Sequence, residues 1–134
     1  MTVALAHQAT PTGHLALTQA GREAVMRETP LVVIHVVAAI DLDNTEAFTG
    51  GITDEISTVV AEAGLNNLTW RLELTTAKDD AGVPDAVLSV VDRSDAELLV
   101  IGARRRSPVG KFLLGSATQT MILHADIPVL VVKA

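Results

Sequence analysis

Two hydrophobic patterns alternate along the chain, and each predicts a different kind of element. The first is a short run of branched aliphatic residues, which is typical of buried strands in a parallel sheet. Four segments follow this pattern: Thr2–His7, Leu31–Val37, Glu97–Ile101 and Ile127–Val132. A fifth strand is expected at Leu68–Leu74, where apolar and polar positions alternate and so predict a strand near a sheet edge.

The second pattern is an apolar position every three or four residues, which predicts amphipathic helices. It covers His14–Arg27, residues 52–63, residues 84–91 and Ser116–His124. Gly64 stands where a glycine would cap the end of the second helix, and Pro84 fits the first turn of the third.

Strands and helices therefore alternate from one end of the chain to the other. This order predicts an α/β fold with a five-stranded parallel sheet and helices on both faces, a doubly wound three-layer sandwich. The sequence has no internal repeat or linker, so residues 1–134 are expected to form a single domain. Because ligands bind beyond the carboxyl ends of strands in such folds, the loops Gln8–Gly13 and Gly102–Gly115 are expected to line one crevice.

Composition narrows the classes of partner. A formal net charge of −6 and a content of one Trp, two Phe and no Tyr argue against a nucleic-acid binder, which needs a basic surface and stacking platforms. The chain has no cysteine, which excludes disulfides, thiolate catalysis and Cys-based zinc sites. No apolar run is long enough to span a bilayer and no cationic leader is visible, so we expect a cytoplasmic protein with no membrane contact.

One segment near the C-terminus carries the most chemistry. An apolar strand runs into Gly102, a cationic loop follows, and Gly115-Ser116 then opens a helix. Four of the ten Lys and Arg residues lie in this loop: Arg104, Arg105, Arg106 and Lys111. A strand, a cationic loop with glycines and a helix N-terminus together build an anion site in α/β proteins, and Ser116 is expected to be the N-cap of the helix.

Other catalytic and metal-binding patterns fit the sequence poorly. A P-loop needs glycine at position 105 and Ser or Thr at position 112, where this chain has Arg105 and Phe112. No Ser-His-Asp combination has a nucleophile-elbow context, so hydrolase chemistry is not expected. No metal site is expected either, because the four histidines are scattered along the sequence at His7, His14, His35 and His124.

Over essentially its whole length the chain resembles the universal stress protein family. The family's adenine-nucleotide signature is a glycine, two residues, a second glycine, nine residues, and a last glycine followed by Ser or Thr. The same spacing here gives Gly102, Arg105 and Gly115-Ser116, so an arginine replaces the middle glycine. The ending His124–Val132 resembles the family's last helix and strand. In the N-terminal loop, Gln8 stands where the family usually has an aspartate.

The resemblance implies an adenine-nucleotide site, with ATP or AMP as the ligand and Mg if the ligand is ATP. Arg105 gives up the positive φ and close backbone approach that a glycine allows, and Gln8 is neutral and a poor magnesium ligand. Arginine side chains of the loop can hold phosphate instead. The implied site comprises Gln8, Ala9, Thr10, Val36, Val37, Gly102, Arg104, Arg105, Gly115, Ser116, Ala117 and Thr118.

The last strand, Ile127–Val132, is apolar on both faces and is expected at a sheet edge, where it would pair with a second copy in a homodimer, as is common in the family. Three functions stay open. The first is a regulatory module that binds nucleotide weakly or in an altered way, and the second is a dimeric stress-response interaction protein with a degenerate pocket. The third is a slow ATPase or autokinase with Ser116 or Thr118 as acceptor. No convincing general base supports the third, so a binding module is expected rather than an enzyme.

Overall fold

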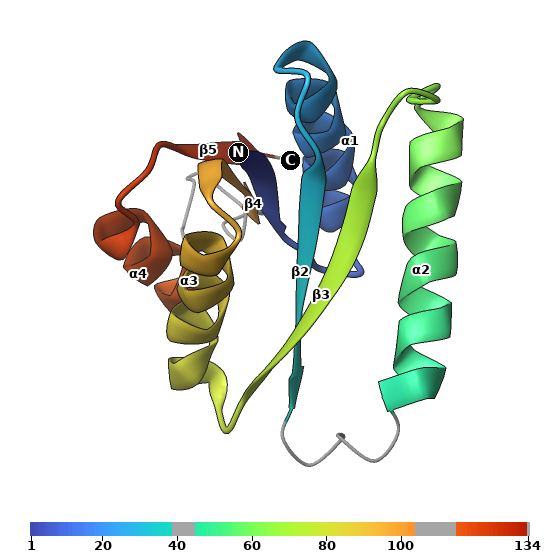
Figure 1. The fold of residues 1–134 in the computed structure, drawn as a ribbon. Helices are drawn as coiled ribbons and strands as arrows, with labels where there is room; N and C mark the ends of the chain where they lie inside the picture. The colour runs from blue at the N-terminus through green and yellow to red at the C-terminus, as the bar shows by residue number, and fades with distance from the viewer. Residues whose placement is uncertain (39–44, 104–114, 134) are drawn as a thin grey trace, which may run out of the picture.

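The computed structural model describes residues 1–38, 45–103 and 115–133, and within these ranges five strands alternate with four α-helices (Figure 1). The strands are β1 (Thr2–Ala6), β2 (Leu31–Ala38), β3 (Trp70–Ala77), β4 (Ala96–Ala103) and β5 (Val129–Lys133). The helices are α1 (Pro11–Met26), α2 (Thr45–Glu62), α3 (Val83–Arg93) and α4 (Ser116–His124), with a short 3₁₀ helix, η2 (Asp80–Gly82), before α3. The predicted order of elements is confirmed.

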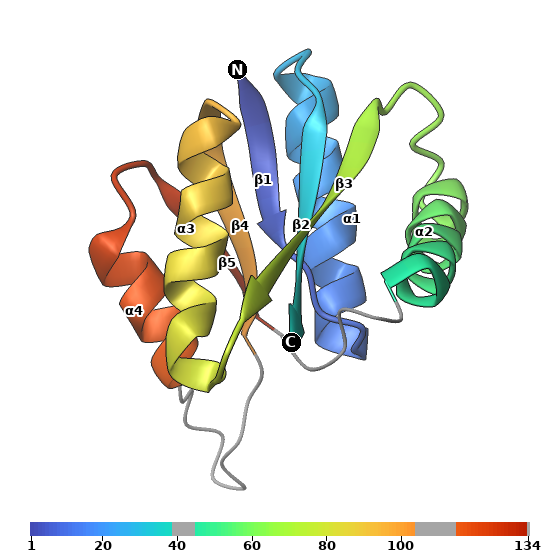
Figure 2. The same ribbon diagram turned by 60° about the horizontal axis from the view of Figure 1, so that its bottom comes forward.

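The sheet is parallel and its strand order is β3-β2-β1-β4-β5. Helices α1 and α2 pack on one face and α3 and α4 on the other, which confirms the doubly wound sandwich (Figure 2). From β1 the chain builds the sheet toward β3, and it then returns to the other side of β1 to add β4 and β5. Strand order therefore reverses between β1 and β4, the place where ligands bind in such sheets.

Side chains of the central strands alternate between two apolar layers. Val3 and Leu5 of β1 pack in the layer beneath α1 and α2, whereas Ala4 packs in the layer beneath α3 and α4. All three are fully buried. Burial on both faces explains why the sequence of this strand reads as a continuous apolar run.

The two edges of the sheet are formed by β3 and β5, as the sequence predicts. Helix α2 begins at Thr45, well before the expected start at residue 52, and therefore includes Gly50 and Gly51. Packing of the buried Ile52 and Ile56 against the core outweighs the low helix propensity of the two glycines.

Candidate functional site

A cavity of about 790 Å³ opens beyond the carboxyl ends of β1, β2 and β4, and its size is that of a small-molecule pocket. The predicted site residues that line it are Gln8, Ala9, Thr10, Val36, Gly102, Gly115, Ala117 and Thr118. The loop after β1 and both ends of the segment after β4 therefore meet at one cavity, as the sequence predicts.

Two other predicted site residues that the structure describes, Val37 and Ser116, do not contribute to this lining. Val37 is buried and Ser116 is exposed, and neither side chain borders the cavity. Val37 follows Val36 on β2, so its side chain points to the opposite face of the sheet. Arg104 and Arg105 lie outside the described residues.

The loop after β1 is held in a fixed conformation by the start of α1. The Thr10 hydroxyl is the N-cap and accepts a hydrogen bond from the Gly13 N–H at 3.0 Å, and Pro11 occupies the first turn. The Gln8 carbonyl lies directly against Gly13: a Cβ at position 13 would be 1.8 Å from that oxygen. A side chain at position 13 would therefore displace Gln8 from the cavity wall.

The end of β4 packs against the same helix. A Cβ at Gly102 would be 3.2 Å from the Thr12 carbonyl oxygen and 3.3 Å from the Ala16 Cβ. Thr12 and Gly102 both line the cavity. Glycine at position 102 thus permits the close approach of β4 and α1 at the base of the cavity.

Helix α4 brings its N-terminus to the opposite side of the cavity. The N-cap is Gly115, in an extended conformation and without a side-chain cap, and the helix starts at Ser116. The prediction that Ser116 is the N-cap is therefore wrong by one position. The first backbone N–H groups of a helix have no partner within it, so this helix start, with Ala117 and Thr118 on the cavity wall, is suited to an anion.

The rim beside β3 carries three charged residues, Lys78, Asp79 and Asp80, which line the cavity from the β3–α3 connection. Asp79 has a structural task, because its Oδ1 accepts a hydrogen bond of 3.0 Å from the Gly82 N–H and caps η2. The rim is therefore mixed in charge, and one of its two carboxylates is already engaged.

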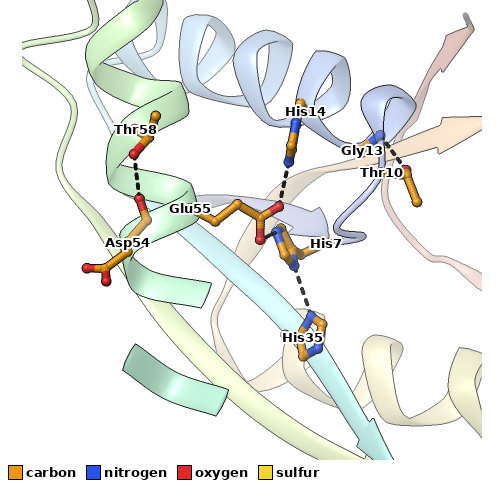
Figure 3. A network of polar contacts seen from close by, with 8 residues as sticks. All are labelled: His7, Thr10, Gly13, His14, His35, Asp54, Glu55 and Thr58. Carbon is orange, nitrogen blue, oxygen red and sulfur yellow. Dashed lines mark hydrogen bonds and ion pairs between the residues drawn. The ribbon is translucent and has the colours of Figure 1, made fainter. Parts of the chain in front are cut away.

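Histidines converge behind the cavity in a manner that the sequence did not suggest (Figure 3). His7 and His35 both line the cavity, and their Nδ1 atoms lie 2.9 Å apart. Glu55 of α2 points between His7 and His14, with Oε2 3.4 Å from His7 Nε2 and Oε1 2.5 Å from His14 Nε2. We call His35, His7, Glu55 and His14 the histidine chain.

Burial lowers the pKa of both inner histidines. For His7 the loss of solvation is the largest effect, the Glu55 carboxylate opposes it, and the neighbouring histidines add to it. The pKa of His35 is lowered by burial and partly restored by Glu55. Both rings therefore favour the neutral form at neutral pH.

These shifts predict that acid destabilises the fold below about pH 6.5. The folded pKa values lie below the unfolded value of about 6.5, so the unfolded chain binds more protons and stability falls as pH falls. We expect the free energy of unfolding, measured by urea denaturation, to fall as the pH is lowered from 6.5 to 5.5. The His35→Gln variant should show a smaller drop, and an equal drop in both proteins would contradict this assignment.

The histidine chain does not form a metal centre. Among the described residues, no three or more His, Asp or Glu side chains are arranged to hold a metal ion. Within the same part of the chain, none of the helices combines the length and apolar character needed to cross a membrane.

Comparison with known proteins decides the family. The family model described as "Universal stress protein family" matches residues 1–133. The chain is also 37% identical over 134 residues to a universal stress protein of Mycolicibacterium smegmatis (strain ATCC 700084 / mc(2)155), covering 98% of this chain and 96% of that protein. The chain belongs to the universal stress protein family.

Solved structures of universal stress proteins share this fold. One from Archaeoglobus fulgidus has a TM-score of 0.77 and 25% identity, covering 98% of this chain and 97% of that one. A second, from Archaeoglobus fulgidus in complex with dAMP, has a TM-score of 0.70 and 21% identity, with 98% and 96% covered. A third universal stress protein, in complex with cAMP, has a TM-score of 0.70 and 20% identity, with 99% and 96% covered.

Sequence reasoning for this universal stress protein missed the histidine chain. One signal was available, because β1 and β2 pair in parallel with Ala6 opposite Ile34. The next residues, His7 and His35, thus emerge side by side at the ends of neighbouring strands. The contribution of Glu55 depends on how α2 is rotated over the sheet, which the periodicity of that helix did not specify.

Proposed function

We propose that this protein is a regulatory module that binds an adenine nucleotide of the AMP type in the cavity beyond β1, β2 and β4. The observation that carries the proposal is the convergence of three elements on that cavity. The Gln8 loop, Gly102 and the N-terminus of α4 all line it, at the point where strand order reverses.

The chemistry of the walls suits the parts of a nucleotide. Backbone N–H groups at the start of α4 provide a site for a phosphate, which the helix dipole favours. Ile34, Ile101 and Met121 give the cavity apolar wall against which a base can pack. Gln8 can donate and accept hydrogen bonds to a ribose or a base.

Related structures support this choice of ligand. Universal stress proteins of the same fold are known in complex with dAMP and with cAMP. Both ligands carry an adenine base and one phosphate. The common chemistry favours an adenine nucleotide with a single phosphate as the first ligand to test here.

Magnesium-bound ATP fits the described part of the cavity less well. The carboxylates among the described lining residues are Asp79 and Asp80, and Asp79 already caps η2. At the N-terminal loop, Gln8 offers a neutral amide, which is a weak ligand for magnesium. These residues do not fit a magnesium site, so the proposed ligand is a nucleotide whose binding needs no metal.

We further infer a binding role without catalysis, exercised by a homodimer paired through β5. Two polar side chains that line the cavity are already engaged: the Thr10 hydroxyl caps α1, and His7 is buried within the histidine chain.

The proposed dimer rests on β5. This strand lies at a sheet edge and has half-buried apolar side chains from Val129 to Val132, which a second copy would cover.

Titration calorimetry with AMP tests the proposed function. We expect saturable heat with a Kd of about 1 mM or lower, in the presence of EDTA as well as in magnesium. Adenosine, which lacks the phosphate, should bind more weakly than AMP. An absence of heat at millimolar AMP would overturn the proposal and favour a nucleotide-independent interaction protein.

A further inference from the structure

The histidine chain links the protein surface to the cavity wall, and nucleotide binding as described above does not require it. Its outer member, His14 on α1, is partly exposed, with 42% of its side chain accessible to solvent. Its inner members, His7 and His35, border the cavity. The side chain of His7 is fully buried, and its Nε2 has no hydrogen-bond partner although it faces Glu55 at 3.4 Å.

The distances restrict where the protons of the neutral chain reside. A proton on His7 Nε2 faces the Glu55 carboxylate, whereas a bare Nε2 would set a lone pair against its oxygen. His7 Nδ1 is then the acceptor in the 2.9 Å contact, and His35 Nδ1–H is the donor. In this arrangement both ring nitrogens of His7 face a group of complementary polarity.

As long as the Nδ1–H donor stays on His35, one further proton fits the His35 ring and does not fit the His7 ring. Protonation of His7 Nδ1 would set two N–H groups against each other at 2.9 Å. Protonation of His35 on its second ring nitrogen keeps the Nδ1–H donor to His7 in place. The added charge then resides on His35, which lines the cavity.

We propose that the histidine chain is a pH-dependent charge switch, in which mild acidification places a positive charge on His35 and strengthens the binding of an anionic nucleotide. The inference rests on the proposed function, because it concerns the same cavity. The burial that lowers the pKa of His35 also makes its added charge effective, since screening by water is weaker there.

The titratable groups that act on His35 come from two neighbouring elements. His7 of β1 contacts it, with the Nδ1 atoms 2.9 Å apart, and the carboxylate of Glu55 on α2 raises its pKa. His14 of α1 contacts Glu55. On β3 its partner in the sheet is the apolar Leu74. The rim of the cavity adds the exposed residues Lys78, Asp79 and Asp80.

Cyclic AMP is the appropriate probe between pH 7.5 and pH 5.5, because its phosphodiester keeps one negative charge over that range. The phosphate of AMP, in contrast, titrates at about pH 6. Calorimetry in EDTA should show cAMP binding about fivefold tighter at pH 5.5 than at pH 7.5. The His35→Gln variant should lose this pH dependence, so that its affinity for cAMP is the same at pH 7.5 and at pH 5.5. The matched control His124→Gln changes an exposed histidine at the end of α4 and should keep the full effect.

A second variant separates a charge switch from a structural role. Glu55 raises the pKa of His7 and His35, so Glu55→Gln should move the midpoint of the pH effect to lower pH. NMR titrations of the ring protons measure the midpoint of His35 directly. The Glu55→Gln change should lower this midpoint, and bound cAMP should raise it. Equal affinity for cAMP at both pH values, or an unchanged His35 titration in Glu55→Gln, would overturn the switch. Absence of cAMP binding at every pH would also overturn the switch, whereas absence of binding by both cAMP and AMP would overturn the proposed function itself.

Discussion

An Ala9→Trp variant should bind AMP at least about tenfold more weakly than the unmodified protein. Ala9 is exposed and lines the cavity, so an indole at this position enters the space that the nucleotide would occupy. A tenfold loss corresponds to about 1.4 kcal/mol of binding free energy, which is modest for a bulky side chain that displaces a ligand. Titration calorimetry measures the effect directly.

Ala61→Trp is the matched control for this experiment. Ala61 is exposed near the end of α2 and does not line the cavity. Both variants change an exposed alanine, so their free energies of unfolding should stay within about 0.5 kcal/mol of the parent. Equal AMP affinity in Ala9→Trp and Ala61→Trp would show that the nucleotide does not occupy this cavity.

A Gly13→Ala variant should be the most damaging small substitution near the site. The added Cβ would lie 1.8 Å from the Gln8 carbonyl oxygen and 2.7 Å from its carbonyl carbon, far inside van der Waals contact. Because Gly13 is buried in the first turn of α1, the neighbouring backbone must move to make room. We expect a loss of about 3 kcal/mol in the free energy of unfolding, measured by urea denaturation.

The same change should also weaken nucleotide binding, because the backbone that moves carries Gln8. Gly50→Ala is the control: Gly50 lies within α2, and a Cβ there would meet nothing within 4 Å. In that open position alanine should stabilise the helix by up to about 1 kcal/mol. If Gly13→Ala were as stable as the parent, the tight contact between Gln8 and the start of α1 would be refuted.

Local sequence patterns were sufficient to predict the order of elements and the place of the cavity. Continuous apolar runs such as Leu31–Ile34 indicate burial on both faces, and the loops after β1 and β4 converge because parallel strands all end on the same side. Gly102 could be placed at that convergence because it follows directly on such a run.

Local sequence patterns could not predict the features that depend on tertiary packing. Gly50 and Gly51 have low helix propensity, yet α2 continues through them because Ile52 and Ile56 are buried against the core. The N-cap of α4 falls on Gly115 although Ser116 has the better capping side chain.

The histidine chain shows the same limit at the site itself. His7, His14 and His35 are far apart in sequence, and only the pairing of β1 with β2 and the position of α2 bring them to Glu55. Helical periodicity identifies which side of α2 is apolar, but it does not state which polar residue at the margin of that side reaches the end of a neighbouring strand.

The most direct test of the central claim is to map AMP onto the protein by amide NMR during a titration. The account predicts saturable shifts at Ala9, Gly102 and Gly115, which line the cavity from three different elements. Gly64, which follows α2 away from the cavity, should not shift. Shifts that saturate at other residues while these three stay unchanged, or no saturable shift at all, would contradict nucleotide binding at this site.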